Sequence, residues 1–299
     1  MSLTRFLVFI LALTLVAPST SFSTISLPWS TSFNYAECTQ RGGGGATDCS
    51  TVADDGVEWN WGATAINGNY TQNTNAANNP LSVGNGARFW VGDGDNQNSG
   101  EIKVTFATLQ TEIWVRWYMR YQYGSKWLTD GDYGNTPLYD KMIYIKTTGL
   151  SGSIAAIPEW KHDFYTISAQ ASSADDALES TASYGWSSIM GGDLSDGNWH
   201  LFEIHIKMDT GGANGIGQVW IDNTLAVENM AMNWSNNNSN ALLGWSYIEW
   251  HGNHRYPDNS IAVYVDYDDI AISNTGYIGP IEESSPAHTS NISGSFTIQ

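Results

Sequence analysis

The strand-like segment 112–123 places several side chains that can handle protons and carboxylates on one face. Its residues alternate in direction, so Arg116, Tyr118 and Arg120 point the same way, with Gln122 beyond them. Cleaving a uronate polymer by β-elimination needs a group that neutralises the sugar carboxylate, a base for the adjacent proton and an acid for the leaving oxygen. The two arginines suit the first role, and the tyrosine suits either of the others.

Two further strand-like segments could complete such a site. One alternates so that Tyr247 and His251 share a polar face, and the other does the same with His205 and Lys207. We expect His251 or Tyr118 to act as the base that removes the proton, and Tyr118 or Tyr247 to act as the acid that protonates the leaving oxygen. The alternative is that the arginines of segment 112–123 pair with surface acids on a solvated face.

The same faces could bind a polysaccharide without reacting with it, because aromatic rings stack on sugars while amides and carboxylates bind hydroxyls. Core packing is the alternative for each tryptophan, since the chain contains 14 of them. The residues that we expect to contact a polymer in addition to the catalytic set are Trp114, Gln122, His205, Lys207, Trp220, Trp245 and Glu249.

Calcium is the metal that the acidic segments favour, because it prefers oxygen ligands. Asp93 and Asp95 lie in one oxygen-rich segment, where an acidic hairpin turn is the alternative. Asp266, Asp268 and Asp269 form a second candidate. The apolar alternation changes parity at the last two, which predicts a β-bulge that redirects their carboxylates. No other cofactor is expected.

The elements that carry these residues predict an all-β fold with very little helix. Between residues 24 and 273 the dominant pattern is alternation with period two, bounded by clusters of Gly, Asn, Asp and Ser. A sheet with one apolar face must bury that face, so we expect an antiparallel two-sheet β-sandwich. We expect a single domain over residues 24–280 and a poorly ordered Ser/Thr-rich tail over residues 281–299.

Charge and the N-terminal segment restrict partners and location. The 299 residues include 12 basic and 30 acidic ones, and the resulting net charge of −18 disfavours nucleic acids as partners. Residues 1–23 have the basic start, apolar run and small-residue exit of a secretory signal peptide, and no segment is apolar enough to suggest a membrane span. We therefore expect a secreted protein, extracellular or periplasmic. The sequence makes no prediction of oligomeric state.

The two cysteines of the chain, Cys38 and Cys49, flank a glycine-rich segment. In an exported protein we expect them to form a disulfide, with two free thiols as the alternative. Closing so short a loop stabilises the fold by roughly 3 kcal/mol on the chain-entropy model.

Several segments resemble the concanavalin A-like lectin/glucanase jelly rolls. Residues 198–207 and 215–223 resemble a hairpin of that family, although Asn223 stands where the family usually has glycine. Residues 263–273 resemble the closing strand, near which related domains often hold structural calcium, and residues 28–34 resemble the opening strand. The likeness implies a jelly-roll sandwich, and its motifs are mostly structural.

Within that superfamily, residues 114–121 and 141–145 are similar to the central strands of secreted polysaccharide lyases, which implies a polymer groove across the concave sheet. A glucanase of this fold would carry Glu-x-Asp-x-x-Glu or Glu-x-Asp-x-Glu, and neither pattern occurs. We therefore predict a polysaccharide lyase acting on a uronate-containing polymer. A non-catalytic carbohydrate-binding protein and an extracellular structural protein are the alternatives.

Overall fold

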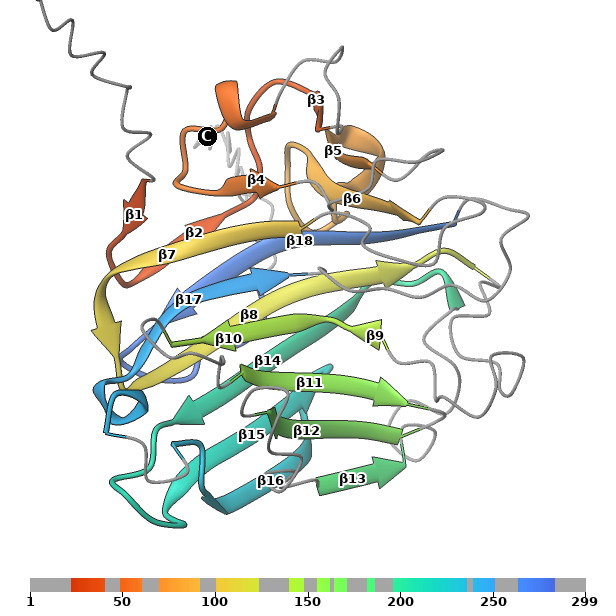
Figure 1. Ribbon diagram of the computed structural model, residues 1–299. Helices are drawn as coiled ribbons and strands as arrows, with labels where there is room; N and C mark the ends of the chain where they lie inside the picture. The colour runs from red at the N-terminus through yellow and green to blue at the C-terminus, as the bar shows by residue number, and fades with distance from the viewer. Residues whose placement is uncertain are drawn as a thin grey trace, which may run out of the picture.

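The computed structural model of the chain describes residues 23–40, 49–60, 70–91, 101–123, 140–147, 155–161, 164–170, 182–185, 196–235, 239–250 and 263–282. These residues form two sheets that pack face to face as a β-sandwich (Figure 1). Every strand pair is antiparallel among the described residues except the parallel pair of β1 and β7. The expected all-β, two-sheet sandwich is confirmed.

The strands of each sheet come from distant parts of the chain. In spatial order, the first sheet contains β1 (Thr24–Ile25), β7 (Glu101–Gln110), β17 (Trp245–Trp250), β10 (Ile143–Lys146), β11 (Ala155–Lys161), β12 (Phe164–Gln170) and β13 (Ala182–Gly185), with β4 (Glu58–Asn60) beside β7 and β9 (Asp140–Lys141) beside β11. The second contains β16 (Thr224–Met232), β15 (Gly215–Ile221), β14 (His200–Lys207), β8 (Glu112–Tyr121), β18 (Val263–Ser273), β6 (Gly86–Val91), β5 (Tyr70–Thr74) and β3 (Cys38–Gln40), with β2 (Trp29–Thr31) beside β18. Helix in the described ranges is limited to the 3-10 turns η1 (Cys49–Thr51), η2 (Asn75–Ala77) and η5 (Ala241–Leu243).

The core lies between the two sheets and follows from the alternation of the strands. Val115 and Trp117 of β8 are fully buried, as are Val104 of β7 and Ile248 of β17 in the opposite sheet. Each such side chain stabilises the fold by about 1.5–3 kcal/mol when it leaves water. The residues between them therefore point to the outer faces of the sandwich.

The bulge predicted in β18 is present. Its pairing with β8 shifts register between Asp268 and Ala271, and Asp269 adopts a left-handed backbone conformation with φ of 49°. Tyr267 before the shift and Ile270 after it are both buried, which accounts for the change of parity in the sequence.

The predicted disulfide joins Cys38 of β3 to Cys49 of η1, and both residues are buried in the core cluster. Most of the expected signal peptide and the tail beyond Glu282 lie outside the described residues, so both stay predictions. Within the described ranges, no helix has the length and apolar character that a membrane crossing requires.

Candidate functional site

Polar side chains stand in two cross-strand rows on the outer face of the first sheet. Their neighbours along each strand, such as Ile145 and Ile248, are buried in the core, so the rows face away from it. Strand register puts each residue opposite the next within its row. We call these residues the first-sheet cluster: Glu58, Lys103, Glu249 and Tyr144 in one row, and Thr105, Tyr247 and Lys146 in the other.

Two lysine–glutamate ion pairs lie within the cluster. Lys146 Nζ is 2.5 Å from Glu249 Oε2, and Lys103 Nζ is 3.3 Å from Glu58 Oε2. Glu58 also accepts a hydrogen bond from Thr105 Oγ1 at 3.2 Å. The lysine side chains are 19% and 23% exposed and both glutamates 11%, so the charges interact more strongly than they would in bulk water.

Tyr247 lies between the two lysines. Lys103 Nζ is 5.0 Å from the centre of its ring and Lys146 Nζ is 5.7 Å away, distances at which cations are attracted to an aromatic face. Burial, and then the negative charges of Glu249 and Glu101, raise the pKa of Tyr247 to about 12. The phenol therefore keeps its proton at neutral pH and is able to act as a proton donor.

The catalytic residues predicted on segment 112–123 lie on the opposite side of the sandwich. Arg116, Tyr118 and Arg120 belong to β8 of the second sheet, whereas Tyr247 belongs to β17 of the first. They therefore do not form one site with Tyr247. His251 lies outside the described residues and stays a prediction.

Arg116 and Tyr118 of the second sheet bind the chain segment 277–282, which we call the C-terminal strap. Tyr118 Oη accepts a hydrogen bond from Ile281 N, and Arg116 Nη1 donates one to Gly279 O at 3.1 Å. Glu203, fully buried beneath the strap, accepts from the backbone of Ile278 and of Gly279. Arg116 and Tyr118 thus have a structural role that their sequence pattern did not reveal.

Arg120 contributes to a buried charge cluster. Asp266 is fully buried, and its carboxylate accepts hydrogen bonds from Arg88 and from Arg120. Both guanidiniums also lie against rings, Arg88 over Tyr264 and Arg120 over Trp199. The expected alternative, an arginine paired with an acid, therefore describes Arg120, although the acid is buried rather than on the surface.

The predicted calcium ligands of β18 do not fit a metal site. Both oxygens of Asp266 are taken by guanidinium groups, which would repel a cation. Asp268 accepts from Asn79 N and Asp269 from Asn79 Nδ2, and burial together with the Asp269 charge raises the pKa of Asp268 to about 8. No group of three His, Cys, Asp or Glu side chains placed to hold a metal ion occurs among the described residues. Asp93 and Asp95 lie outside them.

The predicted polymer-contact residues are divided between the core and both outer faces. Trp245 is fully buried against Trp234, with ring centres 5.9 Å apart, so it is not available to a polymer. The pairing of β17 with β7 is irregular between Trp245 and Tyr247, and at this end of β17 burial no longer follows the alternation of the strand. Glu249 lies in the first-sheet cluster.

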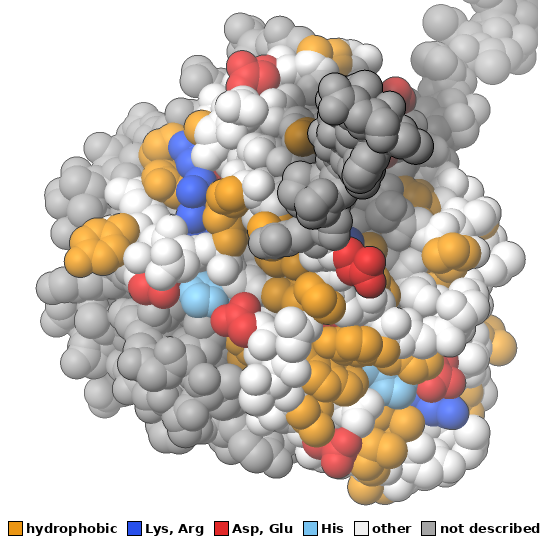
Figure 2. Space-filling model, turned by 180° about the vertical axis from the view of Figure 1, so that it is seen from behind, with side chains coloured by type: hydrophobic (Ala, Val, Ile, Leu, Met, Phe, Trp, Pro, Cys, Tyr) orange, Lys and Arg blue, Asp and Glu red, His pale blue; other side chains and the backbone are white. Residues whose placement is uncertain are grey.

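The remaining contact candidates lie on the second sheet, whose outer face is seen in Figure 2. Trp114 stacks on His205 with ring centres 4.1 Å apart, and Glu112 lies 2.9 Å from His205 Nε2 and forms an ion pair with Lys207. Hydrophobic side chains form a band across this face, beside separate small groups of charges (Figure 2). The other two candidates lie apart from Trp114, His205 and Lys207. The ring centres of Trp220 and Tyr277 of the strap are 5.4 Å apart. Gln122 Oε1 accepts a hydrogen bond from Tyr264 N.

Sequence reasoning missed both lysines of the first-sheet cluster. Lys103 lies between the apolar residues Ile102 and Val104, and Lys146 lies two residues beyond Tyr144. The alternation of each strand therefore predicts that both lysines point away from the core. The order of strands in the sheet brings them to Tyr247, and alternation along one strand does not predict that order.

No protein-family model matches the chain, and no curated protein matches it. Solved structures of similar fold include alginate lyase Aly36B, in a variant with a lysine and a tyrosine replaced by alanine and an alginate tetrasaccharide bound. That structure is 14% identical with a TM-score of 0.55, over 84% of this chain and 98% of its own. A second variant, with alginate trisaccharide, is 15% identical with a TM-score of 0.54, over 82% and 97%. The cellulose-induced protein Cip1 is 16% identical with a TM-score of 0.46, over 73% and 92%. At these identities the Aly36B likeness concerns the fold.

Proposed function

We propose that this protein is a polysaccharide lyase that cleaves a uronate-containing polymer on the outer face of the first sheet. The observation that carries the proposal is the position of Tyr247, a protonated phenol between Lys103 and Lys146. This arrangement combines a proton donor with two cations in a partly buried setting.

Two lysine ammonium groups supply the positive charge of the proposed site. Lys103 and Lys146 lie in the first-sheet cluster, and each is paired with a glutamate. A uronate carboxylate would bind there by taking the place of the glutamate on one of these lysines.

In the proposed reaction, a lysine ammonium binds the uronate carboxylate and so favours loss of the proton on the adjacent carbon. A base removes that proton, the bond from the neighbouring carbon to the bridging oxygen breaks, and a carbon–carbon double bond forms. Tyr247 gives its phenolic proton to the departing oxygen. His251, two residues beyond Glu249 in the sequence, is the proposed base.

The similar structures support the choice of substrate class. Aly36B is described as an alginate lyase, and both variants named above hold alginate oligosaccharides. Alginate is a uronate polymer, so the proposed chemistry is one that a sandwich of this fold can perform. The Cys38–Cys49 disulfide supports the further proposal that the protein is secreted, as an enzyme of extracellular polysaccharide would be.

The test is the ultraviolet absorbance of the unsaturated product. The purified protein is incubated with alginate, glucuronan and pectate, and Tyr247→Phe is compared with the wild type on the polymer that reacts. We expect the substitution to lower turnover by about 10²-fold or more, because it removes only the donor proton. Tyr123→Phe, at an exposed residue, is the matched control with unchanged activity. No product from any polymer would overturn the lyase proposal in favour of carbohydrate binding, and full activity of Tyr247→Phe would overturn the role of Tyr247.

A further inference from the structure

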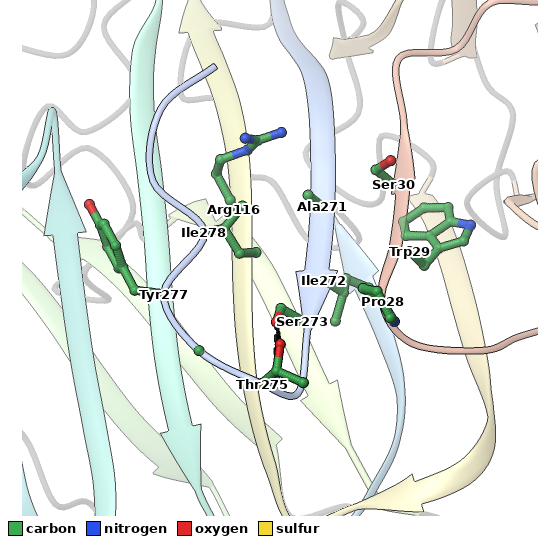
Figure 3. Close-up of a pocket in the computed structure, with 11 residues that line it drawn as sticks. Pro28, Trp29, Ser30, Arg116, Ala271, Ile272, Ser273, Thr275, Tyr277 and Ile278 are labelled. Carbon is green, nitrogen blue, oxygen red and sulfur yellow. Dashed lines mark hydrogen bonds between the residues drawn. The ribbon is translucent and has the colours of Figure 1, made fainter. Parts of the chain in front are cut away.

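A pocket of about 550 Å³ opens on the outer side of the second sheet, beside the C-terminal strap. Figure 3 shows Trp29 of β2 on one side and Ile278 of the strap on the other, with Ala271 and Ser273 of β18 between them. Arg116 closes one end and Thr275 lies at the other (Figure 3). The first-sheet cluster lies on the opposite side of the sandwich and contributes no residue to this pocket.

Arg116 brings a positive charge to the pocket without a direct ion pair. Of the lysine and arginine side chains that the structure describes, it is the one that forms no ion pair. Its Nη1 and Nη2 donate to the backbone carbonyls of Gly279 and Asp269, which are neutral acceptors, and its Nε is buried without a partner. The guanidinium therefore has no charged acceptor within ion-pair distance, and a carboxylate bound in the pocket would supply one.

Two backbone features fix the position of this guanidinium. Asp269, with φ of 49°, forms the bulge of β18, and Gly279, with φ of 75°, forms a turn in the strap. The carbonyl oxygen of each left-handed residue accepts a hydrogen bond from Arg116, one from Nη1 and the other from Nη2. The neighbouring carboxylates of Glu203 and Asp269 accept hydrogen bonds from Gly279 N and Asn79 Nδ2 respectively, and they interact with the Arg116 charge without a direct contact.

We infer that this pocket is a second, non-catalytic binding site for a uronate residue of the polymer. Arg116 receives the sugar carboxylate, the indole of Trp29 offers an apolar wall for the ring, and the hydroxyls of Ser30, Ser273 and Thr275 meet the sugar hydroxyls. The inference rests on the proposed uronate substrate and adds a site on the far side of the sandwich. A polymer held there keeps neighbouring chains close to the first-sheet cluster, as two linked binding sites raise effective concentration.

The test measures binding rather than cleavage, so it does not depend on the lyase proposal. Tyr247→Phe protein is the parent, an alginate trisaccharide is the acidic probe and mannotriose is the neutral one. Calorimetric titration gives affinity and stoichiometry. Ser30→Trp fills the pocket from an exposed position on its rim, and Ser26→Trp is the matched control at an exposed serine outside it. Arg116→Gln removes the charge. Thermal unfolding checks that each variant folds.

We expect the parent to bind the trisaccharide at two sites, and Ser30→Trp but not Ser26→Trp to lose one of them. Arg116→Gln should weaken the same site by about tenfold or more, as expected for a lost charge-assisted hydrogen bond. Mannotriose should not occupy that site. Unchanged stoichiometry in Ser30→Trp, equal binding of mannotriose, or displacement by an equal concentration of acetate would each overturn the inference. If the wild type cleaves no polymer and Ser30→Trp still loses a site, the lyase proposal alone fails.

Discussion

Lys146 and Glu249 form an ion pair with 2.5 Å between Nζ and Oε2, and it joins β10 to β17 directly beside Tyr247. Glu249 thus has two effects on the first-sheet cluster. It holds the ammonium group in place, and its negative charge is one cause of the raised pKa of Tyr247.

Replacing Glu249 with Gln tests the effect of its charge on the pKa of Tyr247. The pKa of Tyr247 is raised by burial first and by Glu249 and Glu101 next, so Glu249→Gln should lower it from about 12 toward the ordinary value. Ultraviolet titration of tyrosinate, taken as the difference from the same protein carrying Tyr247→Phe, measures this pKa directly. Glu112→Gln on the second sheet is the control. An unchanged Tyr247 titration would show that the charge of Glu249 does not contribute to its pKa.

The buried contact of Glu203 with the C-terminal strap should be visible in stability. Glu203 accepts hydrogen bonds from Ile278 N at 2.7 Å and Gly279 N at 2.8 Å, one on each oxygen. Glu203→Gln keeps one acceptor and places an amide donor against the other N–H, so we expect a loss of about 1–3 kcal/mol in the free energy of unfolding. Urea unfolding measures it, and exposed Glu282→Gln should change stability by less than about 0.5 kcal/mol. Equal stability of the two variants would mean that the strap is not anchored through Glu203.

Asp268 should make the protein less stable as pH rises. Burial and the Asp269 charge raise its pKa to about 8 in the folded state, whereas an unfolded aspartate ionises near its ordinary value of about 4. Between these pH values the unfolded chain has released a proton that the folded protein keeps, so the free energy of unfolding falls as pH increases from about 4 to about 8.

Asp268→Asn removes this titration. The difference in Tm between pH 5 and pH 8 should therefore shift by about 2 °C or more between wild type and variant, in the sense that the variant loses less stability at the higher pH. Asp54→Asn, at an exposed residue, is the control. The same pH dependence in wild type and Asp268→Asn would exclude a neutral Asp268 in the folded protein.

The disulfide should account for a measurable share of stability. It closes a loop of sequence separation 11 between two buried residues, so replacing both Cys38 and Cys49 with alanine should cost about 3 kcal/mol on the chain-entropy model. Chemical unfolding of the double variant and of the wild type measures the difference. A loss well below 1 kcal/mol would indicate that the unfolded chain is already restricted in this region.

Features that depend on local alternation were predictable from the sequence. The inward set of segment 199–209, from Phe202 to Met208, is buried as expected, and the parity change at Asp268 and Asp269 marks a real bulge. Trp245 was assigned to the outer face because alternation was continued through a register irregularity that one sequence does not show.

The candidate site was less predictable, because it depends on which strands become neighbours. Tyr247 and Glu249 were expected to contribute, but the arginines of β8 were expected beside them and lie in the other sheet. Pairing partners for Tyr247 come from β7 and β10, which are far from it in the chain. Pairing between distant segments is decided by the packing of the whole sandwich and not by the pattern within any one strand.

The position of β18 has a consequence for how the protein is made. This strand comes last in the second sheet along the chain, yet it lies in the interior of that sheet, where it pairs with β8, β6 and β2. Its contact between Asp266 and Arg120 spans 146 residues. The second sheet therefore cannot close until residue 273 has been synthesised, so β8, β6 and β2 stay without their shared partner strand until then.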